Sequence, residues 1–269
     1  MKKRAPDWRR SRRATTRWAA LGVLLGTLVG LVAFAPAAWL AAAVASATAE
    51  RLLLADARGS IWAGSAVPVL SGGPGSRDAS ALPGRLQWSI GLDGLGFALR
   101  ARHACCINGE LRLRLEPGLG QLKITLPAST GAVGQWPAAW LTGLGTPFNT
   151  MQPAGWLSLS SGGLVAQSAQ GRWLLAGNAA LAMTAISSRV STLDTLGSYR
   201  LDVTGGAVAQ LALSTLEGPL RLSGSGQWAG SGLRFRGEAR AAPGSEAALN
   251  NLLNIIGRRQ GTLAVLSIG

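Results

Sequence analysis

Residues 111–126, "LRLRLEPGLGQLKITL", alternate apolar and polar side chains on both sides of a Pro-Gly turn. Successive side chains of an extended chain point to opposite faces, so Leu111, Leu113 and Leu115 share one face. The arginines between them share the other face, and the alternation resumes after the turn in "QLKITL". A period of two on both sides of a turn predicts two neighbouring strands, each with one buried and one wet face.

The same period dominates the chain from about residue 51 onward. Alternating segments include "LQWSIGL", "YRLDV", "QLALST", "PLRLSGS" and "LRFRGEAR", and stretches such as "SGGPGSRD" supply turns. Many short strands with one wet face predict an antiparallel sheet. A helical pattern, "EAALNNLLNII", follows Ser245 as a cap and stops at Gly257. We therefore expect residues 51–269 to be mainly β, a curved antiparallel sheet (an open barrel or jelly-roll-like fold) with one short C-terminal helix.

Glycines at both ends of several apolar segments, "GSIWAGSA", "GRWLLAG" and "GPLRLSG", predict bulges or bends that let this sheet curl. A large ring can fill the concave side of a curled sheet. We therefore expect Trp62, between Gly59 and Gly64, to be a buried anchor at the first strand. Trp88 and Trp228 are expected to be structural anchors as well. The alternative role for such a ring is binding a partner or a lipid.

The N-terminal region has the properties of a membrane anchor. Residues 18–49 contain no Asp, Glu, Lys or Arg. As a helix rising about 1.5 Å per residue, residues 18–40 would reach roughly 34 Å, enough to cross a hydrocarbon layer of about 30 Å. The sequence therefore predicts a basic cytoplasmic tail (1–17), a transmembrane helix (18–40), a juxtamembrane segment (41–50) and an exported domain.

A cleavable signal peptide is the alternative to an anchor, because "AVA" and "ATA" within residues 43–49 resemble cleavage sites. The apolar core of a signal peptide usually has about 7 to 15 residues. The longer apolar segment of this chain favours a retained anchor. With either outcome, the C-terminal part is exported.

Gly22, Gly26 and Gly30 recur every fourth residue in "GVLLGTLVG". This spacing aligns three small residues on one helix face, where another membrane helix could approach closely. Glycine is also common in membrane helices generally. A helix-packing face and an ordinary lipid-exposed face are the two interpretations.

Charge and residue inventory argue against nucleic-acid binding and catalysis. The chain of 269 residues has a net charge of +14, but residues 1–18 contain eight of its 26 basic residues, and the others are scattered. Without clustered cations and stacking aromatics, we expect no nucleic-acid groove. His103 is the only histidine, and the twelve carboxylates are spread singly along the chain. We therefore expect no catalytic residues, no metal, no cofactor and no enzymatic activity, with His103 a strand or turn residue.

Cys105 and Cys106 are the only cysteines and are neighbours in the sequence. An exported domain meets oxidising conditions, in which disulfides form. Adjacent side chains of a strand point to opposite faces, so a bond between them needs a turn, which could precede "INGEL". A vicinal disulfide is a candidate, and unpaired thiols or an intermolecular bond are the alternatives.

Several strings together resemble a known family, type II secretion system protein N, also called general secretion pathway protein N. After a basic tail and a single anchor come "PAAWLA", "LADARGSIWAGSA", "LPGRLQWSI", "LGSYRLDV", "LSTLEGPLRLSGSGQW" and "LNNLLNIIGRRQG". Each string is short and apolar, and their order and spacing through most of the chain carry the resemblance.

The resemblance implies a single-pass bacterial inner-membrane protein with a cytoplasmic N-terminus and a periplasmic β domain. It would be a non-catalytic part of a machine that exports folded proteins across the outer membrane, with other inner-membrane subunits as partners. The family's likeness to curved AsmA-like sheets implies an alternative, a periplasmic lipid-binding or lipid-conduit protein. A conduit needs an open apolar trough, whereas a scaffold can fill its concave side with its own side chains.

Overall fold

The computed structural model describes residues 8–169, 172–229 and 232–268, and the side chains of 18–168, 173–228 and 232–267. Its helices are α1 (Trp8–Ala33), α2 (Ala37–Ala47), the 3-10 helix η1 (Ala138–Leu144), α3 (Phe148–Met151) and α4 (Glu246–Ile256). Its strands are β1 (Leu52–Gly59), β2 (Ala63–Ser71), β3 (Ala79–Ala81), β4 (Leu86–Asp93), β5 (Gly96–His103), β6 (Leu111–Gly118), β7 (Gln121–Leu126), β8 (Ala132–Pro137), β9 (Pro153–Ala169), β10 (Arg172–Ser188), β11 (Gly197–Gly206), β12 (Ala209–Glu217), β13 (Leu220–Ala229), β14 (Gly232–Ala241), β15 (Arg258–Gln260) and β16 (Leu263–Ile268).

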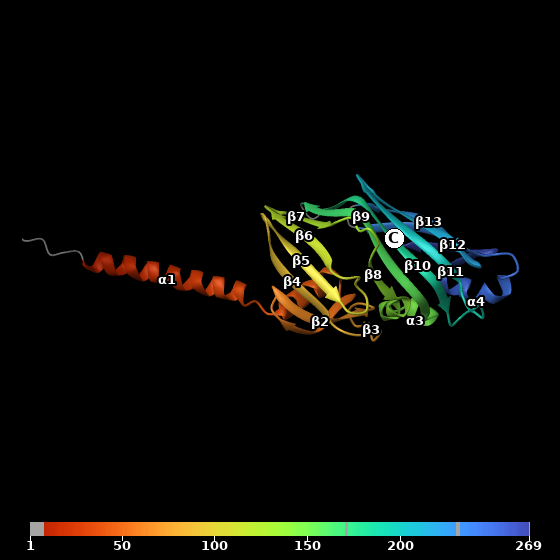
Figure 1. Cartoon of the computed structure of the whole chain (residues 1–269), viewed down its shortest axis with the longest axis horizontal. Coiled ribbons are helices and arrows are strands. Elements are labelled where there is room, and N and C mark those ends of the chain that lie inside the picture. Colours follow the sequence, from red (N-terminus) through yellow and green to blue (C-terminus); the bar gives the residue numbers. More distant parts are fainter. Residues whose placement is uncertain (1–7, 170–171, 230–231, 269) are drawn as a thin grey trace, which may run out of the picture.

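All sixteen strands of the described residues belong to one open antiparallel sheet (Figure 1). The order along it is β1-β2-β4-β5-β6-β7-β9-β10-β11-β12-β13-β14-β16-β15, with β3 paired to β2 and β8 paired to β9. Neighbours in sequence are therefore mostly neighbours in the sheet, as short turns between alternating segments require. The prediction of a mainly β, open antiparallel sheet is confirmed, whereas η1 and α3 were not expected.

The two longest strands, β9 and β10, join the two halves of the sheet. Each has 17 residues, and β9 changes partner along its length, from β8 at residues 156–160 to β7 at residues 164–169. Gly163 in β9 and Gly177 in β10 lie near the point where β9 changes partner, with positive φ angles of 95° and 86°. The pairing register between β9 and β10 shifts between Gly177 and Ala179. Glycine permits this backbone, so the sheet bends here, as the glycine-bracketed segments predict.

The helix predicted over residues 18–40 is interrupted before residue 40. α1 ends at Ala33, and α2 begins after Pro36, whose φ of −70° and ψ of 150° are extended. Proline has no N–H to continue a helical ladder, and it disfavours helical geometry in the residue before it. Among the described residues, we find no helix with both the length and the hydropathy that crossing a membrane requires.

The folded β domain begins before residue 51. Pro36 forms a bridge with Ser60, and Ala35 and Ala37 are 2% and 1% exposed. α2 therefore packs on the sheet, although residues 41–50 were expected to link the membrane to the domain. In Figure 1, α1 alone projects away from the sheet.

Two clusters of buried side chains hold the domain together. Around α4, Leu249, Leu252 and Leu253 are at most 1% exposed and pack against Tyr199 and Leu220 of the sheet. This apolar face is the one that the helical pattern predicts. The second, smaller cluster comprises Ala37, Ala66 and Trp88, with partly buried neighbours.

The three tryptophans expected to be anchors lie in different environments. Trp88, in β4, is 5% exposed. Trp62 is only partly buried and lies in the turn between β1 and β2, so its expected burial at the first strand is wrong. Trp228 is 38% exposed on β13, where the face of the sheet is open to solvent.

Candidate functional site

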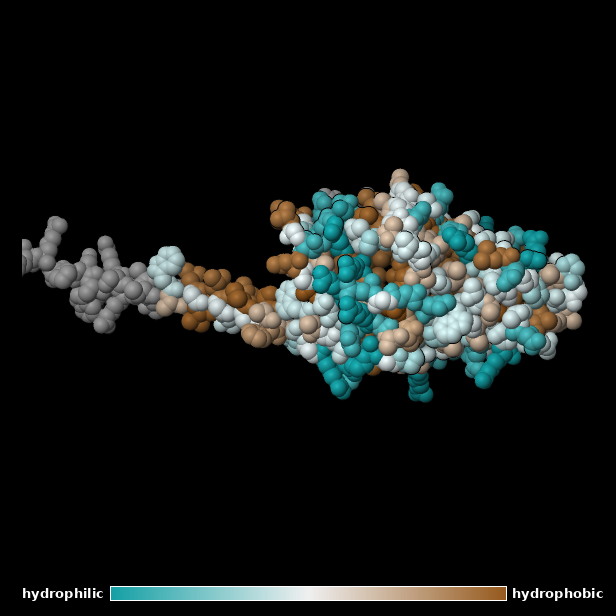
Figure 2. Space-filling view, viewed as in Figure 1, coloured by the Kyte–Doolittle hydropathy of each residue, from teal (hydrophilic) through white to brown (hydrophobic). Residues whose placement is uncertain are grey.

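α1 exposes a continuous apolar surface that the rest of the described chain does not cover. Figure 2 shows it in brown, along the helix that leaves the β domain. The side chains are between 49% and 70% exposed, and they are Leu21, Val23, Leu24, Leu25, Leu28, Val29, Leu31 and Val32. A large exposed apolar surface marks a site of contact with a membrane or another protein.

The three glycines of the predicted packing face lie on this helix. At Gly22, Gly26 and Gly30, an added Cβ would meet no atom within 4 Å. Close packing within the chain therefore does not explain them. The structure leaves room beside this face for another helix.

The junction between α1 and the sheet is held by backbone and indole groups. Trp62 Nε1 donates to the carbonyl oxygen of Val32, in the last turn of α1, at 2.8 Å. The N–H of Ala35, just beyond the helix, donates to the same oxygen at 3.4 Å. The Trp62 ring lies 6.1 Å from the ring of Phe97. Beside it, the N–H of Ile61 donates to the carbonyl oxygen of Ala35 at 2.9 Å. Trp62 therefore ties the end of α1 to β5.

The buried Trp88 also contacts the turn between β1 and β2. Its Nε1 donates to the carbonyl oxygen of Ile61 at 3.1 Å. Its ring lies so close to Gly64 that a Cβ there would approach Trp88 Cζ2 to 2.5 Å. Gly64 is therefore required for close approach of the ring, and both tryptophans act on one turn.

Arginine and carboxylate side chains form ion pairs in and beside β1, β5 and β6. Glu110 accepts hydrogen bonds from Arg112 and Arg102, both at 2.6 Å, and these hold the pKa of its carboxyl below the ordinary value. Asp56 accepts from Arg85 at 2.7 Å and from Arg58 at 3.1 Å, which lower its pKa in the same way. These carboxylates are bound to arginines on the same chain, an arrangement of structural ion pairs.

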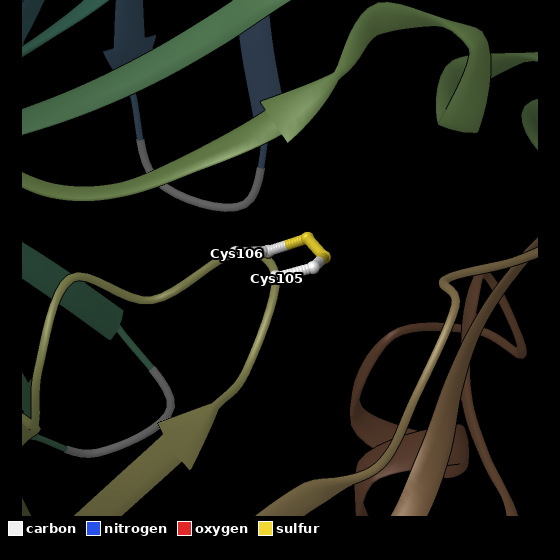
Figure 3. Close-up of a disulfide and its surroundings, with 2 residues drawn as sticks. All are labelled: Cys105 and Cys106. Carbon is white, nitrogen blue, oxygen red and sulfur yellow. A yellow bond between two sulfur atoms is a disulfide. The ribbon is translucent and has the colours of Figure 1, made fainter.

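The predicted vicinal pair lies in the turn that follows β5. The structure joins the Sγ atoms of Cys105 and Cys106 in a disulfide (Figure 3). The N–H groups of Cys106 and Ile107 both donate to the carbonyl oxygen of His103 at 3.2 Å, which closes the turn. Cys106 is 1% exposed, whereas Cys105 is exposed.

His103 is buried beside this pair, at 4% exposed, with no hydrogen-bond partner for either ring nitrogen within the described part of the chain. Burial lowers the pKa of its imidazole. One of its ring nitrogens and the Sγ atoms of Cys105 and Cys106 are ligand atoms that lie within 4.8 Å of one another. The three residues were not expected to form one site, although they lie within the four-residue string "HACC".

The apolar side chains of the sheet are covered differently in its two halves. Beneath α4, apolar side chains leave a cavity of about 170 Å³, lined in part by Met183, Leu196 and Leu252. In the other half, Ile90 pairs with Leu99, and Leu99 pairs with Leu113, so an apolar stripe crosses β4, β5 and β6. These three side chains are only partly buried, and Ile90 and Leu99 pack against the cluster of Ala37, Ala66 and Trp88.

Comparison with known proteins identifies one family. A family model described as "Type II secretion system (T2SS), protein N" matches residues 50–265. No curated protein and no solved structure matches the chain. The match covers nearly all of the strands of the β domain and begins after α1 and α2.

Proposed function

The chain belongs to the type II secretion system protein N family, which gives it a role in type II secretion, and from this premise we propose its place in that machine. It is a non-catalytic component of the bacterial inner membrane, with its basic tail in the cytoplasm and its β domain in the periplasm. The partners are other inner-membrane subunits of the system. The observation that carries this proposal is the uncovered apolar surface of α1.

The apolar part of α1 is the proposed membrane anchor, extended at one end by basic residues. Its 26 residues correspond to about 39 Å of helix, and the uncharged residues 18–33 to about 24 Å. Basic side chains next to such a segment extend its reach by snorkelling to the headgroups of a layer about 30 Å thick. Trp18 and Trp39 are 74% and 55% exposed, and exposed tryptophans near the ends of a span suit the two interfaces.

The glycine face of α1 supports a helical partner. Gly22, Gly26 and Gly30 allow a neighbouring backbone to approach, and no side chain of the described chain uses that space. The bonds of Trp62 and Ile61 to the end of α1 hold the β domain next to the membrane surface. A partner bound at the helix would therefore meet the domain as well.

Lipid binding by an AsmA-like sheet is the second candidate function. The partly buried stripe of Ile90, Leu99 and Leu113 favours it. The cavity beneath α4 does not add to it, because about 170 Å³ is below the roughly 300–1,000 Å³ of small-molecule sites. Leu249, Leu252 and Leu253 of α4 pack on the sheet beside this cavity, as in a scaffold that fills its own apolar face.

In-cell crosslinking separates these functions. A photoreactive residue at Val23 or Val29, which flank the glycine face, should capture another inner-membrane secretion subunit. The same residue at Leu24 or Leu28, on the opposite side of the helix, is the matched control and should capture little protein. Equal capture from both sides would contradict a glycine packing face.

Two further measurements test the location and the lipid alternative. A reporter that is active only outside the cytoplasm should work when fused after Gly269, and the protein should keep its first 49 residues by mass. An inactive reporter or a shortened chain contradicts the anchored topology. Photoreactive residues at Leu99 or Leu113 should capture no lipid, and lipid captured there would favour the second function.

A further inference from the structure

We propose that the turn after β5 is a metal site: in its dithiol form it binds one copper(I) ion through the Sγ atoms of Cys105 and Cys106 and a ring nitrogen of His103. The proposal rests on the arrangement of these side chains and is independent of the role in secretion.

The three side chains are already close enough to share one ion. Their ligand atoms lie within 4.8 Å of one another. Metal–sulfur and metal–nitrogen bonds of roughly 2.0–2.3 Å place the ligand atoms of one site roughly 3.5–4 Å apart. Breaking the bond between the two sulfur atoms frees them to separate to that distance. Small rotations of the side chains complete the site without moving β5.

His103 supplies an independent indication of a ligand. It is 4% exposed, and both Nδ1 and Nε2 lack a hydrogen-bond partner among the described residues. Buried polar groups are almost always paired, because an unpaired one has lost its hydration without replacement. A cation bound to one ring nitrogen would give this imidazole the partner that the fold does not provide.

The backbone around the turn holds the ligands in place. The N–H of Gln135, in β8, donates to the carbonyl oxygen of Cys106 at 3.0 Å, and the N–H of Asn108 donates to that of Val133 at 3.1 Å. A Cβ at Gly134 would approach the carbonyl oxygen of Cys106 to 2.6 Å, so glycine is needed for β8 to pass this close. The turn is therefore fastened to β8, and the site is largely formed in advance.

The ligand set selects a soft cation. Thiolates favour copper(I) and zinc among the biological metals. Zinc takes four ligands, with a water as the fourth where the protein supplies three. This turn offers three ligands, and two of them, Cys106 and His103, are buried, which leaves little access for a fourth ligand from solvent. Cys105 is exposed, which gives the ion a path from solvent, and Cys106 and His103 are buried, which shields the bound ion.

The disulfide must be opened before the ion binds. A dithiol reductant donates two electrons and two protons, so the bond between the two Sγ atoms breaks, two thiols form, and the reductant becomes its own disulfide. Copper(I) then replaces the two thiol protons, which are released to solvent. Metal binding by the reduced chain is therefore accompanied by proton release.

Anaerobic copper titration tests the proposal. The full-length chain in detergent is reduced with dithiothreitol, freed of it by gel filtration, and titrated with copper(I) against a competing chromophoric chelator. One equivalent should bind to the reduced chain, and none to the same chain left oxidised. X-ray absorption of the complex should show two sulfur neighbours and one nitrogen neighbour. Equal binding by the oxidised and reduced chains would overturn the site.

Variants then assign the ligands. Cys106→Ser and His103→Gln should each weaken copper(I) binding by at least about tenfold, since even outer-shell changes cost about 10–100-fold. Ala104→Ser, in the same turn, changes no ligand and should bind as the parent does. Circular dichroism of each variant establishes that the sheet is retained. Unchanged affinity in a folded His103→Gln chain would refute the three-residue site.

Discussion

At the scale of single residues, tryptophan indoles join elements that lie far apart in the sequence. Trp62 donates to Val32, Trp88 donates to Ile61, and Trp140 donates to the carbonyl oxygen of Ser80 at 3.0 Å. Each N–H satisfies a backbone oxygen while the ring packs beside it, which suits a residue that has both an apolar body and a polar end. These tryptophans therefore act as links between elements, whether fully or only partly buried.

The burial of Trp88 and the exposure of Trp228 predict different costs of truncation. Trp88→Ala should reduce the free energy of unfolding by about 3–5 kcal/mol, because it leaves a cavity and frees the carbonyl oxygen of Ile61. Trp228→Ala, the matched control on the open face, should cost less than about 1 kcal/mol. Urea unfolding of the full-length chain measures both. Similar costs for the two variants would show that burial does not determine how much each tryptophan contributes to the free energy of unfolding.

The ion pairs of Asp56 predict a dependence of stability on pH. Arg85 and Arg58 lower the pKa of Asp56 from its ordinary value of 3.8. The contribution of these ion pairs to the free energy of unfolding is therefore present above pH 3.8 and is lost as the pH falls through the lowered pKa. Asp56→Asn keeps the left-handed backbone, with φ of 48°, since asparagine tolerates it. The stability difference between parent and variant should therefore be full at neutral pH and shrink below about pH 4.

Chemical unfolding across this pH range provides the measurement for Asp56. Asp202→Asn is the control, because Asp202 pairs with one neighbouring arginine on an exposed strand surface. The stability difference between the parent and Asp202→Asn should change less with pH than the difference between the parent and Asp56→Asn. A difference for Asp56→Asn that is constant from neutral to acid pH would exclude the ion pairs as its cause.

At the scale of elements, the helices serve opposite purposes. α4 turns its apolar face, with Leu249, Leu252 and Leu253, into the sheet, so its amphipathic pattern is satisfied within the chain. α1 is apolar around its described surface, and the other described residues leave most of that surface uncovered. A helix that is apolar all round belongs in an apolar environment, which supports its proposed place in the membrane.

The glycine face of α1 is open to a direct test. Replacing Gly22, Gly26 and Gly30 by leucine should leave insertion intact, because hydrophobicity rises, and should weaken association with a partner helix, because the added bulk prevents close approach. A membrane two-hybrid assay measures the association. In the control, Leu21, Leu24 and Leu28 are changed to isoleucine, and association with the partner helix should be retained. Equal association before and after the glycine changes would identify an ordinary lipid-facing surface.

At the scale of the whole molecule, an open sheet must protect its two edges from pairing with other chains. At one edge, β1 carries a register shift between Ala55 and Arg58, and Asp56 there adopts a left-handed backbone. At the other edge, β15 is only three residues long and carries the exposed Arg258. Bulges, short strands and charges are the usual means of preventing edge-to-edge association, and this sheet uses all three.

Removing the charge from the β15 edge should therefore promote self-association. Arg258→Val places a β-forming apolar side chain on an exposed edge, and light scattering of the full-length chain in detergent should show larger particles as concentration rises. Arg258→Lys keeps the charge and should match the parent. Indistinguishable scattering of the valine and lysine variants would show that strand length and the neighbouring turn suffice to protect this edge.

The sequence by itself determined the class of structure and the places of several elements. The alternation in residues 111–126 recurs as the β6–β7 hairpin, and the pattern after Ser245 recurs as α4. Both follow from local periodicity, because the side-chain period of a strand or helix determines which residues share its buried face. The family was also accessible from the sequence, since its strings occur in order along one chain.

Only the tertiary structure decided which distant segments meet. Trp62 is partly exposed because it caps α1 beside Phe97, and no local pattern reveals that the end of α1 lies there. The domain begins at Ala35 because strand pairing at Pro36 draws the chain onto the sheet. Among the described residues, no group reaches the ring nitrogens of the buried His103, which precedes a turn that hydrogen bonds fasten to β8. Burial and proximity of this kind come from strand order and register, which depend on contacts across the whole sheet.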